Sequence, residues 1–274
     1  MAQVDSTRNV TIVAPGAGDT MWVVGERQCF KLGQAVTDGD YLICETVVVP
    51  GGGPPPHVHR DEDEGFYILE GQMEFLGPQC VHVAPAGTFF WAPKRQPHQF
   101  RNKGPTPVRY ILLAIPGQIE RFFRSVATPC RPEEVIPPPL TPELAQHVMT
   151  EAGRWGIDVV DLPEPAERRA VPQAVESVED GVRRLVWCAA DDAAGMPQVD
   201  ELYLPAGAAV DVGGSETRHA ALVVLEGAIE IHCSDERYIA SAGSYAHLRD
   251  SAEVNTGTSP ARVLRYLIQA RPQE

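Results

Sequence analysis

Two histidines and a carboxylate lie close together in the segment GGGPPPHVHRDEDEG, after a turn rich in glycine and proline. Alternate residues of a β-strand project to the same face, so His57 and His59 would present two imidazoles to one ion. Glu64 lies an odd number of positions from His59, so a bend or bulge between them is needed to bring it onto that face. A third imidazole, His98, follows in the segment PKRQPHQFRN. This spacing predicts that the four side chains form a metal site.

The donor atoms of this candidate site are of mixed nitrogen and oxygen type. Three neutral imidazoles and one carboxylate suit Fe(II), Mn(II), Co(II), Ni(II) or Zn(II), and the set lacks the thiolate that favours a soft metal. Such a set leaves one or two coordination positions for water, a substrate or dioxygen. We therefore predict one divalent transition metal per chain, held by His57, His59, Glu64 and His98.

The charge of the chain argues against several classes of partner. Its 274 residues carry a formal net charge of -14 without a basic stripe, so we expect neither nucleic acid nor an anionic membrane as a partner. The N-terminal residues lack a charged-then-apolar signal pattern, and no run of about 18 apolar residues occurs. The six cysteines are scattered without a CxxC pair. These features predict a soluble, cytoplasmic protein without a disulfide framework.

Short strand-like runs fill the chain before its proline-rich centre. YLICETVVV, FYILEG, QMEFL, TFFWA and VRYILLAI are each closed by Gly, Pro, Asn or Asp, which indicates an antiparallel sheet. A different pattern follows in TPELAQHVMTEAGRWG, where Leu144, Val148 and Ala152 recur at helical spacing. With Thr141 as its N-cap, this segment predicts a helix over about 141–155.

A second strand-rich region near the C-terminus repeats the first. VAPAGTFFWA and VRYILLAI correspond to IASAGSYAHL and VLRYLIQA, and YILEGQMEF corresponds to VVLEGAIEI. In each copy a glycine, Gly87 or Gly243, precedes an Arg-Tyr pair by the same 22 and 23 positions. The repeat predicts an N-terminal metal-binding barrel at 1–125, a Pro-rich linker at 126–175 and a C-terminal barrel at 176–274.

In order and in register, the residues of the first copy resemble the two motifs of the cupin superfamily. The first motif, Gly, five residues, His-x-His, three or four residues, Glu, six residues, Gly, is matched by Gly51, His57, His59, Glu64 and Gly71. The second motif, Gly, five residues, Pro-x-Gly, two residues, His, three residues, Asn, is matched by Gly87, Pro93, His98 and Asn102. Arg95 departs from the second motif, because it occupies the inner glycine position and leaves the conformation of that turn open.

The resemblance implies an all-β fold of two cupin barrels (jelly-roll, double-stranded β-helix) with a short helical linker, which is a bicupin. Segments after the first barrel look like those of bacterial quercetin 2,3-dioxygenase-like oxygenases, where a helix covers the barrel. That likeness implies Fe(II) as the first choice of metal, Glu64 as the catalytic base that takes the proton of a metal-bound substrate hydroxyl, and a homodimer. Coordination lowers the pKa of such a hydroxyl, so the transfer is feasible near neutral pH.

The second copy lacks the ligands of the first. The positions equivalent to the four ligands hold Gly213, Ser215, Ala220 and Val254. None of these side chains binds a transition metal, although His219, His232 and His247 are nearby in the sequence. We therefore predict a degenerate C-terminal barrel with a structural role, which packs against the first, hides a sheet edge or shapes the pocket.

A barrel that holds an open-sided metal and has an apolar lining is typical of a small-molecule pocket. Strand parity predicts a wall made of Phe66, Ile68, Phe75, Phe89, Trp91 and Phe100. The favoured function is a metal-dependent oxygenase or dioxygenase that uses dioxygen on a small phenolic, enolic or β-dicarbonyl compound, in a setting such as natural-product metabolism. Two alternatives stay open, a non-redox cupin isomerase, cyclase or decarboxylase and a non-catalytic small-molecule-binding bicupin.

Overall fold

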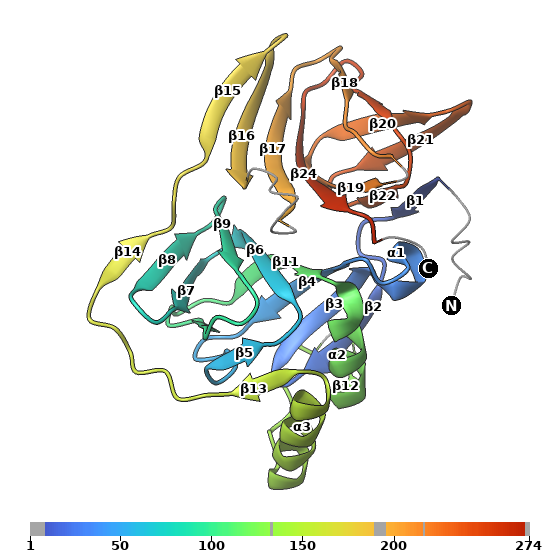
Figure 1. Ribbon diagram of the computed structural model, residues 1–274. Helices are drawn as coiled ribbons and strands as arrows, with labels where there is room; N and C mark the ends of the chain where they lie inside the picture. Colours follow the sequence, from blue (N-terminus) through green and yellow to red (C-terminus); the bar gives the residue numbers. More distant parts are fainter. Residues whose placement is uncertain (1–8, 132–133, 189–195, 216, 272–274) are drawn as a thin grey trace. The chain divides into compact units, whose positions relative to one another are not determined.

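The computed structural model describes residues 9–131, 134–188, 196–215 and 217–271, and these residues form two compact units (Figure 1). Gly18–Gln34 and Tyr41–Val171 form one, here called the N-terminal unit. The rest of the described chain forms the C-terminal unit, which therefore includes Ala35–Asp40 and the residues before Gly18. No helix in the described part of the chain is long and apolar enough to cross a membrane.

The N-terminal unit is built from two main sheets. The seven-stranded sheet has the order β12 (Ala127–Pro129), β2 (Asp19–Val23), β3 (Glu26–Leu32), β4 (Leu42–Val48), β11 (Val108–Ile115), β6 (Asp63–Glu70) and β9 (Phe89–Ala92). The four-stranded sheet has the order β10 (Gln99–Arg101), β7 (Gln72–Leu76), β8 (Val81–Pro85) and β14 (Arg168–Ala170). A short pair, β5 (His57–His59) and β13 (Ile157–Val159), completes the barrel.

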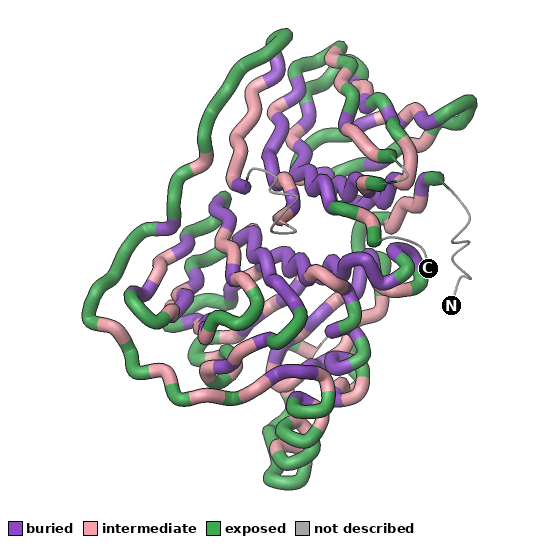
Figure 2. The backbone as a smooth tube through the Cα atoms, in the orientation of Figure 1, coloured by how far each residue is buried: buried purple, intermediate pink, exposed green. Residues whose placement is uncertain are grey.

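The apolar sequence of the central strands explains why they lie inside this barrel. FYI in β6 and YILLA in β11 are buried at consecutive positions, so side chains on both faces of the sheet are removed from solvent (Figure 2). Inside the barrel, Phe66, Phe75, Phe100 and Tyr110 form a connected aromatic cluster with ring centroids 4.9–6.5 Å apart. This packed cluster fixes the strands that carry the candidate site.

The linker after this barrel contains the predicted helix, α3 (Pro142–Arg154). The Thr141 Oγ1 accepts a hydrogen bond from the Leu144 backbone N–H, so Thr141 is the N-cap. Most of α3 is exposed, but Ala152 is buried and Val148 packs against the core of the N-terminal unit. Two shorter helical segments, η1 (Gly117–Ile119) and α2 (Glu120–Val126), precede the linker, and α2 contacts α3.

The C-terminal unit has the same two-sheet plan. Its seven-stranded sheet has the order β1 (Val10–Val13), β22 (Tyr245–Leu248), β19 (Arg218–Glu226), β24 (Ala261–Gln269), β17 (Gln198–Leu204), β16 (Val182–Cys188) and β15 (Val175–Glu179). Its second sheet has the order β18 (Ala209–Asp211), β23 (Glu253–Asn255), β20 (Ala228–Cys233) and β21 (Glu236–Ser241). The N-terminal strand β1 thus belongs to the C-terminal unit, and the short helix α1 (Gln34–Thr37) lies where the chain passes between the units.

The two units repeat one another down to single hydrogen bonds. In the N-terminal unit the Gly87 N–H donates to the Ile68 carbonyl at 2.8 Å, and in the C-terminal unit the Gly243 N–H donates to the Val224 carbonyl at 2.8 Å. Gly87 and Gly243 both have a left-handed backbone, with φ of 77° and 86°. The predicted all-β fold of two barrels with a short helical linker is therefore confirmed.

Candidate metal centre

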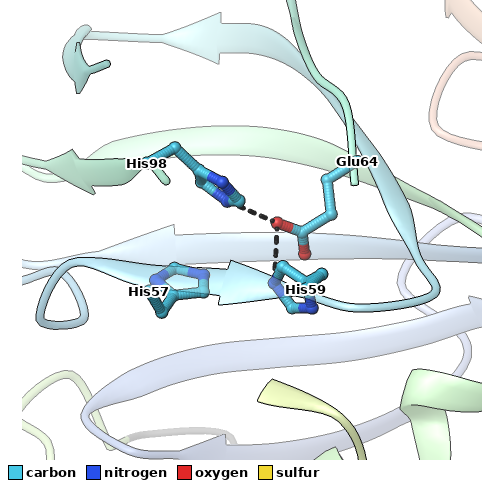
Figure 3. Close-up of side chains that lie close together, drawn as sticks. All are labelled: His57, His59, Glu64 and His98. Carbon is cyan, nitrogen blue, oxygen red and sulfur yellow. Dashed lines mark hydrogen bonds and ion pairs between the residues drawn. The ribbon is translucent and has the colours of Figure 1, made fainter. Parts of the chain in front are cut away.

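Four side chains from three parts of the N-terminal unit meet at one point inside the barrel (Figure 3). One ligand atom from each of His57, His59, Glu64 and His98 can be chosen so that all four lie within 4.8 Å of one another. The Glu64 carboxylate is central, because its Oε2 lies 3.3 Å from His59 Nε2 and 3.2 Å from His98 Nε2. All four residues are buried.

Backbone pairing brings His98 to the other two histidines. The His57 N–H donates to the His98 carbonyl and the His98 N–H donates to the His57 carbonyl, both at 2.9 Å. On its other edge β5 pairs with β13, where Ile157 lies opposite His59. The short strand β5 is therefore held from both sides, which fixes the positions of its two histidines before any ion binds.

Backbone carbonyls determine which ring nitrogen of two histidines points to the centre. The Nδ1 of His57 is 3.0 Å from the Pro55 carbonyl, and the Nδ1 of His98 is 3.1 Å from the Gln96 carbonyl. A carbonyl can only accept, so each Nδ1 carries a proton, and it is Nε2 of each ring that is available to bind a metal ion. Metal-binding histidines are commonly oriented in this way by a second hydrogen bond.

The electrostatics of the cluster are those of a cation site. Burial, together with the neighbouring His98 and His59, lowers the pKa of His57 to about 3, so this imidazole is neutral. Burial alone would raise the pKa of Glu64, but His59 and His98 lower it well below its usual value, so it is a carboxylate. Burial would lower the pKa of His59, yet the carboxylates of Glu64 and Glu62 outweigh this and raise it to about 10.

The residues fit a bound divalent metal. Neither ring nitrogen of His59 makes a hydrogen bond among the described residues, and the Nε2 of His98 lies 3.2 Å from the Glu64 carboxylate. Donor atoms on opposite sides of an ion at about 2.1 Å would be about 4.2 Å apart, close to the span of this cluster. A cation at the centre would therefore take the place of the His59 proton and meet the Glu64 carboxylate and imidazole nitrogens at one point.

Metal binding should release about one proton near neutral pH, because the ion displaces the proton that His59 holds in the metal-free protein. Below a pH of about 10 this proton competes with the metal, so raising the pH from 7 toward 9 should strengthen binding about tenfold per unit. Isothermal titration calorimetry in buffers of different ionisation enthalpy measures the released proton. A His98→Ala protein controls for protons released elsewhere, and an affinity independent of pH would contradict the prediction.

Arg95 adopts the backbone conformation of the glycine that it replaces. Its φ is 63°, and its N–H donates to the His59 carbonyl at 2.7 Å, so the turn before His98 is formed despite the side chain. The side chain also donates from Nε to the Arg60 carbonyl at 3.3 Å. The turn therefore keeps the left-handed backbone conformation of the motif although arginine replaces glycine.

Replacing Arg95 by glycine should stabilise the metal-free protein by about 0.5–1 kcal/mol, because relief of left-handed strain exceeds the added entropy of the unfolded chain. Urea denaturation measures this change, and metal content should be unaffected. The neighbouring Lys94→Gly variant is the control, since Lys94 is not among the residues with positive φ and should lose stability. A clear loss of stability in Arg95→Gly would show that the side-chain contact outweighs the strain.

An apolar cavity of about 110 Å³ opens onto the cluster and is lined by His57, His59 and Glu64. Among the six residues predicted for its wall, Phe66 and Phe100 line it. Further lining comes from α2 and α3, through Phe122, Phe123, Val148, Met149 and Ala152. The linker helix therefore closes the barrel over the site.

The other four predicted wall residues lie elsewhere in the unit. Ile68 and Phe75 are fully buried in the hydrophobic core. In the register of β6 with β9, Glu64 is opposite Ala92 and Gly65 is opposite Trp91, so Trp91 and Phe89 lie on the other face of the sheet. It is Phe90 that faces inward, where it stacks on Phe75 with ring centroids 4.2 Å apart.

Polar residues that the sequence patterns did not indicate also line the cavity. Glu26 and Gln28 on β3 and Tyr110 on β11 contribute to its wall and are all buried. The signal that could have found them is the alternation in ERQCFKL, where Glu26, Gln28 and Phe30 share one face of a strand. Such alternation of polar residues more often indicates a strand face exposed to solvent. The sequence therefore does not predict that this face is buried.

The equivalent positions of the C-terminal unit cannot hold a metal, and Ser215 among them is exposed. Ala220 and Val254 are fully buried in its hydrophobic core, and a side chain at Gly213 would meet Leu267. His219 and His247 have ring centroids 5.0 Å apart, and His219 Nδ1 lies 3.5 Å from Asp40 Oδ2. Within the described residues, the cluster at Glu64 is the only group of three or more metal-binding side chains that meets one point.

Comparison with known proteins identifies the N-terminal barrel. Residues 44–115 match the model of the cupin domain. The quercetin 2,3-dioxygenase of Bacillus subtilis (strain 168) is 27% identical over 119 residues, which are 43% of this chain and 35% of that enzyme. The match thus spans about a third of the length of the curated relative.

Solved structures resemble the chain along nearly its whole length. Oxalate decarboxylase from Lactobacillus farciminis covers 95% of this chain and 86% of its own, with 10% identity and a TM-score of 0.63. A mutant of Bacillus subtilis oxalate decarboxylase covers 100% and 81%, with 14% identity and a TM-score of 0.63. Protein Ylba from E. coli covers 97% and 93%, with 10% identity and a TM-score of 0.63. At these identities the likeness concerns the fold. The chain therefore has a bicupin fold, and residues 44–115 of its first barrel, which include the four clustered side chains, match the cupin domain.

Proposed function

We propose that the protein is a metal-dependent oxygenase that acts on a small phenolic, enolic or β-dicarbonyl compound bound in the N-terminal cavity. The main support for this proposal is that the candidate metal site lies at the wall of an apolar cavity. Three imidazoles and one carboxylate meet at one point, and that point opens into an apolar cavity closed by α3. The partial match to quercetin 2,3-dioxygenase from Bacillus subtilis supports the same reaction class.

The lining of the cavity favours a neutral substrate over a small dianion. Among the described residues that line it there is no lysine or arginine, and its walls are largely aliphatic and aromatic. A dicarboxylate such as oxalate could place one carboxylate on the metal, but its second carboxylate would be desolvated without a lysine or arginine to pair with it, which is costly. The decarboxylases with a similar fold are therefore poor guides to the substrate of this chain.

The chain's own residues orient the substrate and accept its proton. A bound Fe(II), our first choice among the metals that suit this set, would supply a Lewis acid for a substrate hydroxyl and a redox couple for dioxygen. Glu64, ionised and adjacent to two imidazoles, is placed to accept the hydroxyl proton at Oε2. Phe66 and Phe100 keep the site dry, which strengthens each electrostatic interaction in it.

Oxygen uptake distinguishes this proposal from a non-redox reaction, which the same ligand set would also support. Protein purified anaerobically and reconstituted with Fe(II) is mixed with phenols, enols and β-dicarbonyl compounds in an oxygen electrode. We expect uptake that depends on substrate and metal and is absent from the zinc-loaded protein. Turnover at an equal rate without oxygen would contradict the proposal and favour an isomerase, cyclase or decarboxylase. Binding without product would favour a non-catalytic role.

A further inference from the structure

A second polar group lines the cavity on a strand that carries none of the metal ligands. Glu26 and Gln28 occupy alternate positions of β3, and both are buried, with exposed fractions of 8% and 2%. In the sheet, β4 and β11 separate β3 from β6, which carries Glu64. The cavity is therefore lined by carboxyl groups on two separated strands, although the rest of its wall is largely apolar.

The hydrogen bonds of this group leave part of it unsatisfied. The Tyr110 hydroxyl and the Gln28 Nε2 both donate to Glu26 Oε2, and both distances are long, at 3.4 Å. The Gln28 Oε1 is buried and has no hydrogen-bond partner among the described residues. A buried acceptor without a donor destabilises the protein, so a donor placed in the cavity would be bound favourably.

Glu26 can act as a hydrogen-bond donor, because burial favours its protonated form. Burial, assisted by the charge of Glu64, raises the pKa of Glu26 to about 8, although Gln28 and Tyr110 lower it in part. Near neutral pH this residue is an uncharged carboxylic acid, which can donate a hydrogen bond as well as accept one. Gln28 offers an acceptor beside it. A donor next to an acceptor is the complement of a hydroxyl group, which both donates and accepts.

The size of the cavity limits what can bind between this group and the metal ligands. Its volume is about 110 Å³. An engineered protein cavity of about 150 Å³ binds benzene, whereas pockets for drug-sized ligands measure about 300–1,000 Å³. The volume of the cavity therefore matches a compound with one ring and not one with several fused rings.

We propose that Glu26 and Gln28 form a hydroxyl-binding site, and that the ligand is a single-ring compound with one polar group at the metal ligands and a second at Glu26 and Gln28. This inference rests on the proposed function for the metal-binding end of the ligand. It adds a specificity determinant on β3 and narrows the substrate class from phenolic and enolic compounds in general to small ones with two polar ends.

The test compares two probes that differ by one hydroxyl, para-cresol and para-hydroxybenzyl alcohol. Calorimetry under nitrogen with the metal-loaded protein measures binding without turnover. We expect the wild type to prefer the alcohol by about tenfold or more, the effect of about 1.4 kcal/mol. Glu26→Leu and Gln28→Leu should each abolish or reverse this preference. Glu26→Gln, which keeps a donor and an acceptor, should retain it.

The control variant is Leu112→Val, which alters an apolar residue of the same cavity and should leave the ratio of the two affinities unchanged. If Glu26→Leu fails to fold, Gln28→Leu carries the same test. A wild type without the preference, Leu variants that keep it, or binding of neither probe would overturn the inference. If the protein consumes oxygen but does not prefer the alcohol, the hydroxyl-binding site is contradicted and the oxygenase proposal stands. If the protein prefers the alcohol but consumes oxygen with no compound, the oxygenase proposal is contradicted and the hydroxyl-binding site stands.

Discussion

Replacing His98 by alanine should reduce the metal content of the purified protein from about one equivalent to below about 0.1, as measured by mass spectrometry after anaerobic purification. The change removes one of three imidazole ligands and leaves His57, His59 and Glu64 around a partly open site. The fold should survive, because the two hydrogen bonds that join residues 57 and 98 are made by the backbone alone. His57→Ala should have the same effect, since it removes a second ligand from the same point.

Thermal unfolding provides a second measurement of the same loss. A metal present at about 100 times its dissociation constant stabilises the native state by about 2.7 kcal/mol, so a chelator should lower the Tm of the wild type. It should leave the Tm of His98→Ala unchanged. His232→Ala is the matched control, because His232 lies on β20 of the C-terminal unit beside Glu230 and contacts none of the ligands. Full metal content in His98→Ala would show that the ion binds elsewhere.

The meeting of the four candidate side chains could be predicted from the sequence because their positions depend on local rules. His57 and His59 share a face wherever the backbone is extended, and the spacing of the cupin motifs joins them to Glu64 and to His98. These rules held: β5 is extended, and its pairing with His98 is a backbone contact that tolerates many side chains. Arg95 shows the same tolerance, because the turn keeps its left-handed conformation without a glycine.

The wall of the cavity could not be predicted in the same way, because it depends on the register between strands. A shift of one residue moves every side chain of a strand to the other face. The turn at Gly87 sets β9 so that Phe90 faces inward and Trp91 outward, and the composition FFWA fits either arrangement. The place of Glu26 and Gln28 in the cavity wall could not be predicted for a related reason, since alternate polar residues on a strand usually face water.

The division of the chain also depends on long-range pairing. The predicted boundaries treated residues 1–125 as one barrel, whereas β1 pairs with β22, more than 230 positions along the chain. Arg249 donates to the Val36 carbonyl at 2.9 Å and to Asp38 Oδ2 at 2.8 Å, which joins residues 35–40 to the same unit. The sequence of β1 is only four residues long, which is too short for its hydrophobic pattern to indicate the sheet edge with which it pairs.

Glu64→Gln should keep the metal and lose turnover, with kcat lower by about 10²–10⁴, the usual contribution of a general base. The amide is nearly the same size and keeps an oxygen that can coordinate the ion, so metal content should stay near one equivalent. It cannot accept the substrate proton, because a neutral amide is a very weak base. The metal-free variant should also lose the raised pKa of His59, whose largest favourable contribution comes from the Glu64 charge.

Glu70→Gln is the matched control for this loss, since Glu70 lies at the end of the same strand and is exposed. Its carboxylate pairs with Arg109 at the surface, a contact of little energetic weight. Metal content, probe affinity and kcat of that variant should match the wild type. A Glu64→Gln protein with full metal content and full kcat would show that the proton leaves by another group. Glu26 would then be the next candidate, because it is the other carboxyl group in the cavity wall among the described residues and its pKa of about 8 lies close to neutral pH.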